Sequence, residues 1–301
     1  MPLKNQLHVN QLLSNVSVQY KNSEYIWDKC FPMVSVQKDS DLYRVYDRNF
    51  RIPESKRAPK ALAREFGFEF STSSYLLEQH ALKDYVGVDE EENNDQGSLQ
   101  VDTTESLTDA IYRRMELSLA QLFTTTNWSL NVSLAAGAVW SSNTVTTDPV
   151  PVFDTGATTV INASGKTPNF AILPRDGMIA IKNHVSVLDR VKYTSSEVSQ
   201  SMIAGLLGVG ELLVPTAVQD TAAEGLAVST TPFFADFAFL GWKPASGGIK
   251  TPSCGYTFAK SSPRVRSWFD EERNATAIEV EVKYQHKVVA SLTGYMIQNT
   301  V

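Results

Sequence analysis

The 301 residues contain only two cysteines, Cys30 and Cys254, which is too few for a disulfide framework. The sequence also lacks an apolar run long enough to cross a bilayer, and it lacks a leader with charged, apolar and small-residue regions. Acidic residues outnumber basic ones by 33 to 27, giving a net charge of -6, whereas a surface that clasps nucleic acid throughout is strongly basic. We therefore expect a soluble, intracellular protein that contacts nucleic acid only through local patches.

Motifs for metal, nucleotide and nucleophilic chemistry are missing as well. The four histidines are far apart in the sequence, and neither cysteine has a second cysteine or a histidine within a few residues. There is no Gly-x-Ser-x-Gly elbow and no Gly-x-Gly-x-x-Gly loop. The sequence therefore predicts no catalytic, cofactor-binding or metal-binding residues. An enzyme whose site is assembled from distant residues is the open alternative.

Two short segments come near a known motif and then depart from it. Residues 164–167 read Ser-Gly-Lys-Thr, like the end of a phosphate-binding loop, but Val160 stands where the leading glycine belongs. The acidic run 89–97 has Asn94 where a calcium loop needs glycine and Gln100 where it needs glutamate. We predict neither nucleotide nor calcium binding at these segments.

The strongest local signal is an amphipathic helix over residues 102–126. Asp102 offers an N-cap oxygen, and Glu105 closes a capping box three residues later. No glycine or proline interrupts the segment, which spans roughly 35 Å at the helical rise per residue. Apolar residues recur every three or four positions and predict one buried face: Leu107, Ile111, Met115, Leu119 and Leu122. We expect the rest of the chain to be arranged along this helix.

A long two-stranded excursion is predicted before the helix. Residues 41–52 alternate with large side chains on both faces, as in a strand, and Pro53 ends this pattern. Alternation resumes at Phe66, Phe68 and Phe70 after a polar stretch. Because an isolated two-stranded ribbon is only marginally stable in water, one that projects this far is expected to rest on another surface.

The excursion is basic, with seven basic residues against two acidic ones between Arg44 and Arg64. A solvated charged tip is one interpretation. The other is a contact with a neighbouring subunit, whose acidic surface would attract the tip. The residues that we predict to make this inter-subunit contact are Arg51, Lys56, Arg57, Lys60 and Arg64.

The remaining segments predict a compact mixture of helices and strands. An N-terminal arm, residues 1–38, has apolar residues but no core of its own, so it is expected to lie on the parent domain or on a neighbour, and a frayed terminus is the alternative. We expect the last two strands to lie beside the long helix. The expected helices are 75–85, 174–183 and 195–207. The expected strands are 169–173, 211–218, 233–242 and two between 277 and 297. We also expect a loop over 89–97, short strands and loops over 128–159 and a long loop over 244–255.

Several segments, taken in order, carry a resemblance to a known family. They are residues 43–70, 75–82, 109–115, 168–173, 184–193, 212–217, 251–258 and 294–299. Their order resembles that of the major capsid proteins of tailed bacteriophages, the HK97-fold family, from about residue 25 to the end. No single segment is diagnostic of that family.

The resemblance implies an α+β HK97-like capsid fold. Its expected parts are an N-terminal arm (1–38), an E-loop with its return (39–98), a peripheral domain with a spine helix (99–166), an axial domain (167–262) and C-terminal strands of the peripheral domain (263–301). Two departures stand out. There is no room for a long N-terminal scaffolding segment, and Lys56 and Lys60 lie on the E-loop without a matching asparagine and glutamate for an isopeptide bond.

The resemblance also implies a function. The chain would be a structural protein, not an enzyme, that assembles into the icosahedral head shell of a tailed phage around double-stranded DNA. Expected partners are the chain itself in hexamers and pentamers, a scaffolding protein, the portal, a decoration protein, and DNA through non-specific contacts, with no membrane and no cofactor. It would be assembled in the host bacterial cytoplasm and reside in the virion. An encapsulin-like nanocompartment shell is the alternative, because a fold does not fix function.

Overall fold

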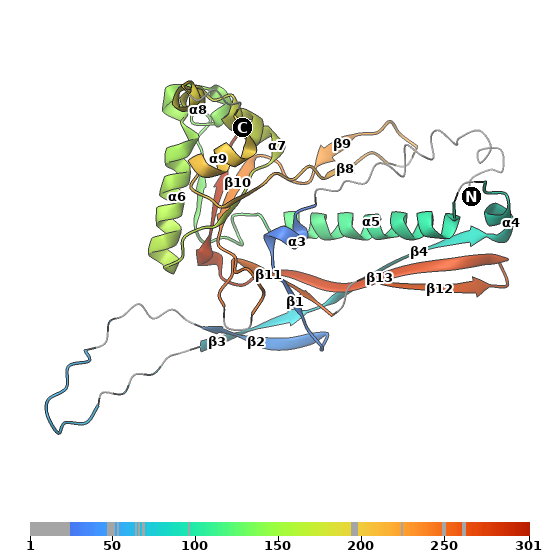
Figure 1. Cartoon of the computed structure of the whole chain (residues 1–301), viewed down its shortest axis with the longest axis horizontal. Coiled ribbons are helices and arrows are strands. Elements are labelled where there is room, and N and C mark those ends of the chain that lie inside the picture. The colour runs from blue at the N-terminus through green and yellow to red at the C-terminus, as the bar shows by residue number, and fades with distance from the viewer. Residues whose placement is uncertain are drawn as a thin grey trace.

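The computed structural model describes residues 25–46, 52, 54–63, 65, 67, 70–95, 97–193, 198–223, 225–248, 251–260 and 263–301. These residues form two five-stranded sheets, a long helix, a group of shorter helices and two two-stranded ribbons (Figure 1). No described helix is both long and apolar enough to cross a membrane.

The first sheet is organised around one long strand, β13 (Ala275–Val288). It pairs along one edge with β4 (Glu78–Gly87), and along the other with β12 (Arg264–Asp270) and β11 (Gly255–Ala259). Beyond β11 lies β1 (Met33–Ser35), which runs parallel to it. Only β13 was among the predicted strands; β11 begins at the end of the loop expected over 244–255, and β12 was not predicted.

The long helix, α5 (Leu99–Ala120), covers one face of this sheet (Figure 1). Ile111 and Met115 pack against a cluster that includes Val280 and Tyr284 of β13. The predicted buried face is therefore confirmed, except that Leu122 lies beyond the helix end.

The predicted start of α5 is wrong. Ser98 is the N-cap residue, so Asp102 lies inside the first turn and the expected capping box with Glu105 does not form. The Ser98 hydroxyl donates to Glu91 Oε1 at 3.0 Å, which ties the helix start to the preceding segment. That segment includes a short helix, α4 (Val88–Glu92), where only a loop was expected.

The helix expected over residues 75–85 is also absent. These residues belong to β3 (Phe70–Leu76) and β4. Ten consecutive residues of β4 pair with β13, from Gly87 opposite Ala275 to Glu78 opposite Tyr284. The apolar spacing was compatible with a helix, but pairing with a strand two hundred residues later in the chain decides the conformation.

The second sheet has the order β5-β14-β10-β6-β7. Its strands are β5 (Asn131–Ser133), β14 (Gly294–Gln298), β10 (Phe237–Gly241), β6 (Phe170–Ile172) and β7 (Glu211–Leu213). Strands β6, β7 and β10 fall within the predicted strand segments. The final strand was expected beside α5 but lies in this second sheet, paired with β10 and β5.

Shorter helices lie beside the second sheet (Figure 1). They are α6 (Pro149–Ser164), α7 (Arg175–Lys182), α8 (Val185–Val191) and α9 (Gln200–Leu206). Helices α7 and α9 were expected, but α6 replaces a segment read as short strands and loops. Three short 3-10 turns, η1 (Trp140–Ser142), η2 (Val145–Thr147) and η3 (Ser291–Thr293), and the ribbon of β8 (Val218–Asp220) and β9 (Thr230–Pro232) complete this part.

The end of the predicted N-terminal arm is part of the core. Its short helix α3 (Trp27–Cys30) lies against α5, and Ile26, Cys30 and Phe31 are buried together with Phe239 of the second sheet. This confirms that the arm's apolar residues lie on the parent domain from residue 26 onward. Residues 1–24 of the arm lie outside the described part of the chain.

Candidate assembly surfaces

The predicted excursion is a ribbon of β2 (Ser40–Tyr46) and β3, which pair antiparallel from Ser40 opposite Leu76 to Tyr46 opposite Phe70. It projects away from both sheets (Figure 1). Aromatic stacking fixes its base on the first sheet: the Tyr75 and Phe258 rings are 4.8 Å apart and nearly parallel. The excursion is thus held at a defined angle, and its outer part reaches into solvent.

A cluster of charges reinforces the base of the ribbon. Asp39 accepts hydrogen bonds from Lys260 and Lys283, at 2.9 and 3.2 Å, and these bonds lower the pKa of the Asp39 carboxyl. The Leu76 N–H donates to Gln285 Oε1 at 2.9 Å. Lys260, directly after β11, and two residues of β13 therefore hold the ribbon where its strands leave the sheet.

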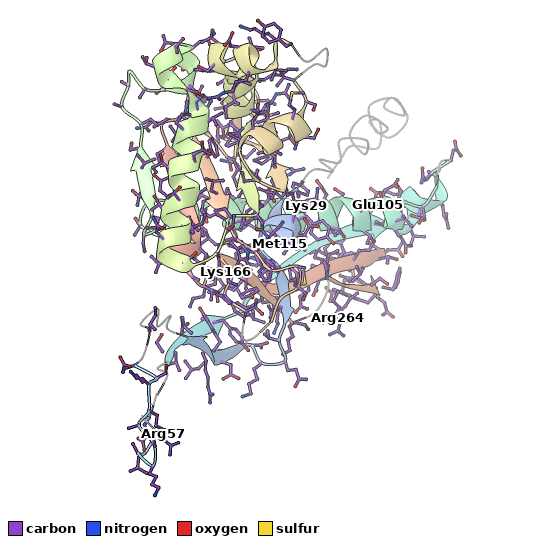
Figure 2. All side chains as sticks on the ribbon, turned by 60° about the vertical axis from the view of Figure 1, so that its left-hand side comes forward. Lys29, Arg57, Glu105, Met115, Lys166 and Arg264 are labelled. Atoms are coloured by element: carbon purple, nitrogen blue, oxygen red, sulfur yellow. The ribbon has the colours of Figure 1, made fainter. Side chains whose placement is uncertain are left out.

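The tip carries three of the five predicted contact residues. Lys56, Arg57 and Lys60 are all exposed, and Arg57 lies far from both sheets (Figure 2). Arg57 Nε donates to the carbonyl of Ala61 within the tip. Arg51 and Arg64 lie outside the described residues, so their positions do not test the prediction.

Apolar side chains on the ribbon are exposed too. Ile52 and Leu62 are 94% and 95% exposed near the tip, and Leu42 and Leu76 are 66% and 60% exposed along the strands. Isolated exposed apolar residues are common, but several of them on one projecting ribbon make this ribbon a candidate contact surface.

The N-terminal segment is attached to α5 through a buried carboxylate that sequence reasoning missed. Glu116 is 0% exposed, and both of its oxygens accept hydrogen bonds from the Ile26 N–H, at 3.2 and 3.1 Å. Its Oε2 also accepts from the Trp27 N–H at 2.9 Å. Burial raises the pKa of Glu116 to about 7, although these backbone hydrogen bonds lower it in part.

Cys30, Cys254 and His286 are residue types that often act in catalysis, but all three are buried here. Burial raises the pKa of the Cys254 thiol to about 12 and that of Cys30 well above its usual value, so both are poor nucleophiles. Burial lowers the pKa of His286 to about 4, and its Nδ1 lies 2.8 Å from the hydroxyl of Thr257. Among the described residues, no three His, Cys, Asp or Glu side chains form a group that could hold a metal.

His184 is fully buried and has both ring nitrogens engaged. Its Nδ1 accepts from the Ser186 N–H at 3.2 Å, which caps α8, and its Nε2 lies 3.1 Å from the hydroxyl of Thr147. These contacts link α8 to η2, so the residue holds the helices together and does not face an open site.

Comparison with known proteins gives a consistent result. No protein-family model matches the chain. The major capsid protein of Burkholderia phage BcepMu is 22% identical over 304 residues, which cover 96% of this chain and 95% of that protein. A phage-related protein from Bordetella bronchiseptica superposes with a TM-score of 0.74 at 23% identity, over 96% of each chain.

More distant solved structures are shell proteins. The capsid structure of cyanophage P-SCSP1u matches with a TM-score of 0.61 at 10% identity, over 89% of this chain and 85% of that one. The holo-SrpI encapsulin complex from Synechococcus elongatus matches with a TM-score of 0.55 at 12% identity, over 90% and 85% of the two chains. The likeness therefore extends over whole shell subunits and is not confined to a shared motif.

Proposed function

We infer that this chain, which has the HK97 capsid fold, is the major capsid protein of a tailed bacteriophage. The observation that carries the inference is the nearly full-length likeness to a phage major capsid protein. The fold supports it, because it presents a projecting ribbon with exposed apolar and basic residues that a neighbouring subunit can cover.

The assembly that we propose is a closed icosahedral shell of hexamers and pentamers of this chain around double-stranded DNA. The additional partners are a scaffolding protein, the portal and a decoration protein. With a net charge of -6, the shell encloses its genome through weak, salt-sensitive contacts that are independent of base sequence. Assembly takes place in the host cytoplasm, and the mature protein resides in the virion. The proposal assigns no catalysis and no cofactor to the chain.

The basic tip of the ribbon is the proposed latch between subunits. Its residues are Arg51, Lys56, Arg57, Lys60 and Arg64, and the latch requires a neighbour to present carboxylates to them. Exposed ion pairs contribute only about 0 to 1 kcal/mol each, so the latch acts through repetition over the shell and sets the register more than the affinity.

We propose the following roles for the parts of the chain. The ribbon and its return (39–98) form the E-loop, residues 99–166 the peripheral domain with α5 as its spine, and residues 167–262 the axial domain. Three elements cross these bounds, because β5 and α6 lie with the second sheet and β11 lies in the sheet covered by α5. Of the final segment, 263–301, β12 and β13 lie in the sheet covered by α5, whereas β14 belongs with the strands of the axial part. We therefore place the end of the chain from Gly294 in the axial domain.

An encapsulin-like compartment is the second candidate, favoured by the structural likeness to the Synechococcus encapsulin. The two functions differ in what the shell contains. A shell gene beside genes for a portal and a packaging motor favours the phage head, and a neighbouring enzyme with a shell-targeting tail favours the compartment.

Electron microscopy of the protein, produced alone and together with a scaffolding protein from the same genome, tests the proposed function. We expect closed shells of uniform size in at least one of these preparations. Sedimentation that shows only monomers and dimers under both conditions and over a range of salt concentrations would contradict it.

A further inference from the structure

Strand β12 forms a free edge of the first sheet. It pairs with β13 on one side, and within the described residues no strand lies on its other side. None of its residues is buried, and Val265, Trp268 and Phe269 are 49%, 41% and 53% exposed. A free edge with apolar side chains is a template for another strand, and single-chain proteins usually protect such an edge with charged side chains, proline, a bulge or a covering element. The strand itself contains no proline.

Both faces of this edge strand are open. Val265 pairs opposite Val280, whose side chain packs against α5, so Val265, Ser267 and Phe269 point to the α5 side of the sheet. Helix α5 packs over β13 and β4 and leaves these side chains exposed. The other face of the strand carries Arg264, Arg266, Trp268 and Asp270.

The sequence of β12, Arg-Val-Arg-Ser-Trp-Phe-Asp, is chemically complementary to its own reverse. We propose that two copies of this chain pair their β12 strands antiparallel about a two-fold axis at Ser267. This register places Arg264 opposite the second copy's Asp270, Val265 opposite its Phe269, and Arg266 opposite its Trp268. Each pairing occurs twice, as an ion pair, an apolar pair and a stacking contact of a guanidinium group on an indole ring, and such cross-strand pairs stabilise antiparallel sheets.

Two charged residues of the strand, Arg264 and Asp270, are available to form ion pairs with a second copy. Arg264 is exposed and has no ion-pair partner among the described residues; Figure 2 labels its position. Arg266 is bound to Glu281 of its own chain at 2.5 Å, so it brings little net charge against an aromatic ring. Asp270 Oδ1 accepts from the Glu272 N–H at 3.1 Å, whereas its Oδ2 has only a contact of 3.9 Å with Arg273, at the limit of an ion pair, and is available to a closer cation.

Other two-fold registers are less complementary. An axis at Arg266 would place two guanidinium groups opposite each other, and an axis at Trp268 would leave Arg264 and Val265 without opposing residues. Only the axis at Ser267 pairs all seven residues. The two first sheets then become one continuous sheet, with an α5 helix on the same face at each end.

This inference rests on the proposed shell function, because assembly is what brings two copies together. Cysteine cross-linking tests the register directly. In the proposed pair the two Cβ atoms at position 267 are about 4.5–5.5 Å apart, so a Ser267→Cys variant is expected to form a disulfide-linked dimer under mild oxidation. The native cysteines do not interfere, since Cys30 and Cys254 are 0% exposed.

A matched control is Val265→Cys on the same face of the strand. Its two copies are four residue steps apart in the proposed register, or roughly 13 Å, which is too far for a disulfide. We expect dimer formation to be at least tenfold faster for Ser267→Cys than for Val265→Cys. Adding Phe269→Cys to Val265→Cys is expected to restore cross-linking, because these two positions oppose each other.

Charge reversal provides a second measurement in the Ser267→Cys background. Arg264→Glu is expected to lower the dimer yield severalfold, and adding Asp270→Lys is expected to recover it. Equal cross-linking of Val265→Cys and Ser267→Cys, or no dimer from Ser267→Cys, overturns the β12 pairing. If the variant forms shells but no disulfide-linked dimer, the β12 pairing is wrong and the proposed shell function stands. If the dimer forms but the chain never assembles into shells, the pairing is supported and the shell function is contradicted.

Discussion

The buried carboxylate of Glu116 makes the stability of the subunit depend on pH in a specific direction. In the unfolded chain a glutamate has a pKa near 4.5, and in the folded chain burial raises the pKa of Glu116 to about 7. Between these values the folded state binds more protons than the unfolded state. Protonation of Glu116 therefore stabilises the folded state fully below pH 4.5, and this stabilisation is lost as the pH rises through 7.

The size of the effect follows from the pKa difference. A difference of about 2.5 units at about 1.4 kcal/mol per unit gives roughly 3 kcal/mol. Glu116 is 0% exposed, so solvent screening does not reduce this figure substantially. Glu116→Gln keeps an acceptor for the Ile26 and Trp27 amides and removes the titration.

The assay is chemical denaturation of the unassembled subunit from pH 4.5 to 8, comparing the wild type with Glu116→Gln. We expect the stability difference between them to shift by about 3 kcal/mol in favour of the glutamine variant as the pH rises. Glu105→Gln, an exposed position on the same helix, is the control for the loss of one carboxylate. A pH-independent difference for Glu116→Gln would refute the reasoning.

Three further predictions follow from the ribbon and the core. Reversing Arg57 and Lys60 to Glu should leave the melting temperature of the subunit unchanged but lower the shell yield, most strongly at low salt where repulsion is unscreened, and wild-type yield at low salt would rule out the latch. The stability difference between the wild type and His286→Gln should shift by up to about 3 kcal/mol in favour of the variant as the pH falls from 6.5 to 4 in denaturation curves, because burial lowers the pKa of His286 and the unfolded state binds the proton first. Tyr75→Ala should cost about 3 kcal/mol of stability and speed hydrogen exchange in β2 and β3, since the ring stacks on Phe258 at the ribbon base, and unchanged exchange would show that the base is held by other contacts.

Local patterns predicted the long helix and the ribbon because both depend on interactions close in sequence. The three-to-four residue spacing of Ile111, Met115 and Leu119 is a property of one helix face, and it located α5 despite an error of a few residues at each end. The alternation before Pro53 likewise located β2. The tip residues could be nominated from charge alone, but the surface that we propose for them lies on another copy of the chain.

Other elements were missed because their determinants are non-local or ambiguous. Residues 75–85 fit a helical period, and only the pairing of β4 with β13 makes them a strand. Helix α6 is rich in β-branched residues, which suggested strands. Its start was nevertheless signalled by Asp148, whose side chain accepts from the Val150 N–H, followed by proline at the first helical position.

The buried carboxylate could not be found from the sequence. On the predicted helix, Glu116 follows Met115 and reads as a solvent-facing polar residue. Its partners, the amides of Ile26 and Trp27, are 90 and 89 positions away. A polar residue becomes a buried anchor only when tertiary structure supplies such donors, and no local pattern reports them.

The proposed shell function is tested most directly by a cryo-electron microscopy reconstruction of the assembled particle. We expect hexamers and pentamers of this chain in which the ribbon of β2 and β3 lies across a neighbouring subunit, with Lys56, Arg57 and Lys60 close to its carboxylates. A particle in which the ribbon contacts no other subunit, or a small open oligomer in place of a closed shell, would contradict it.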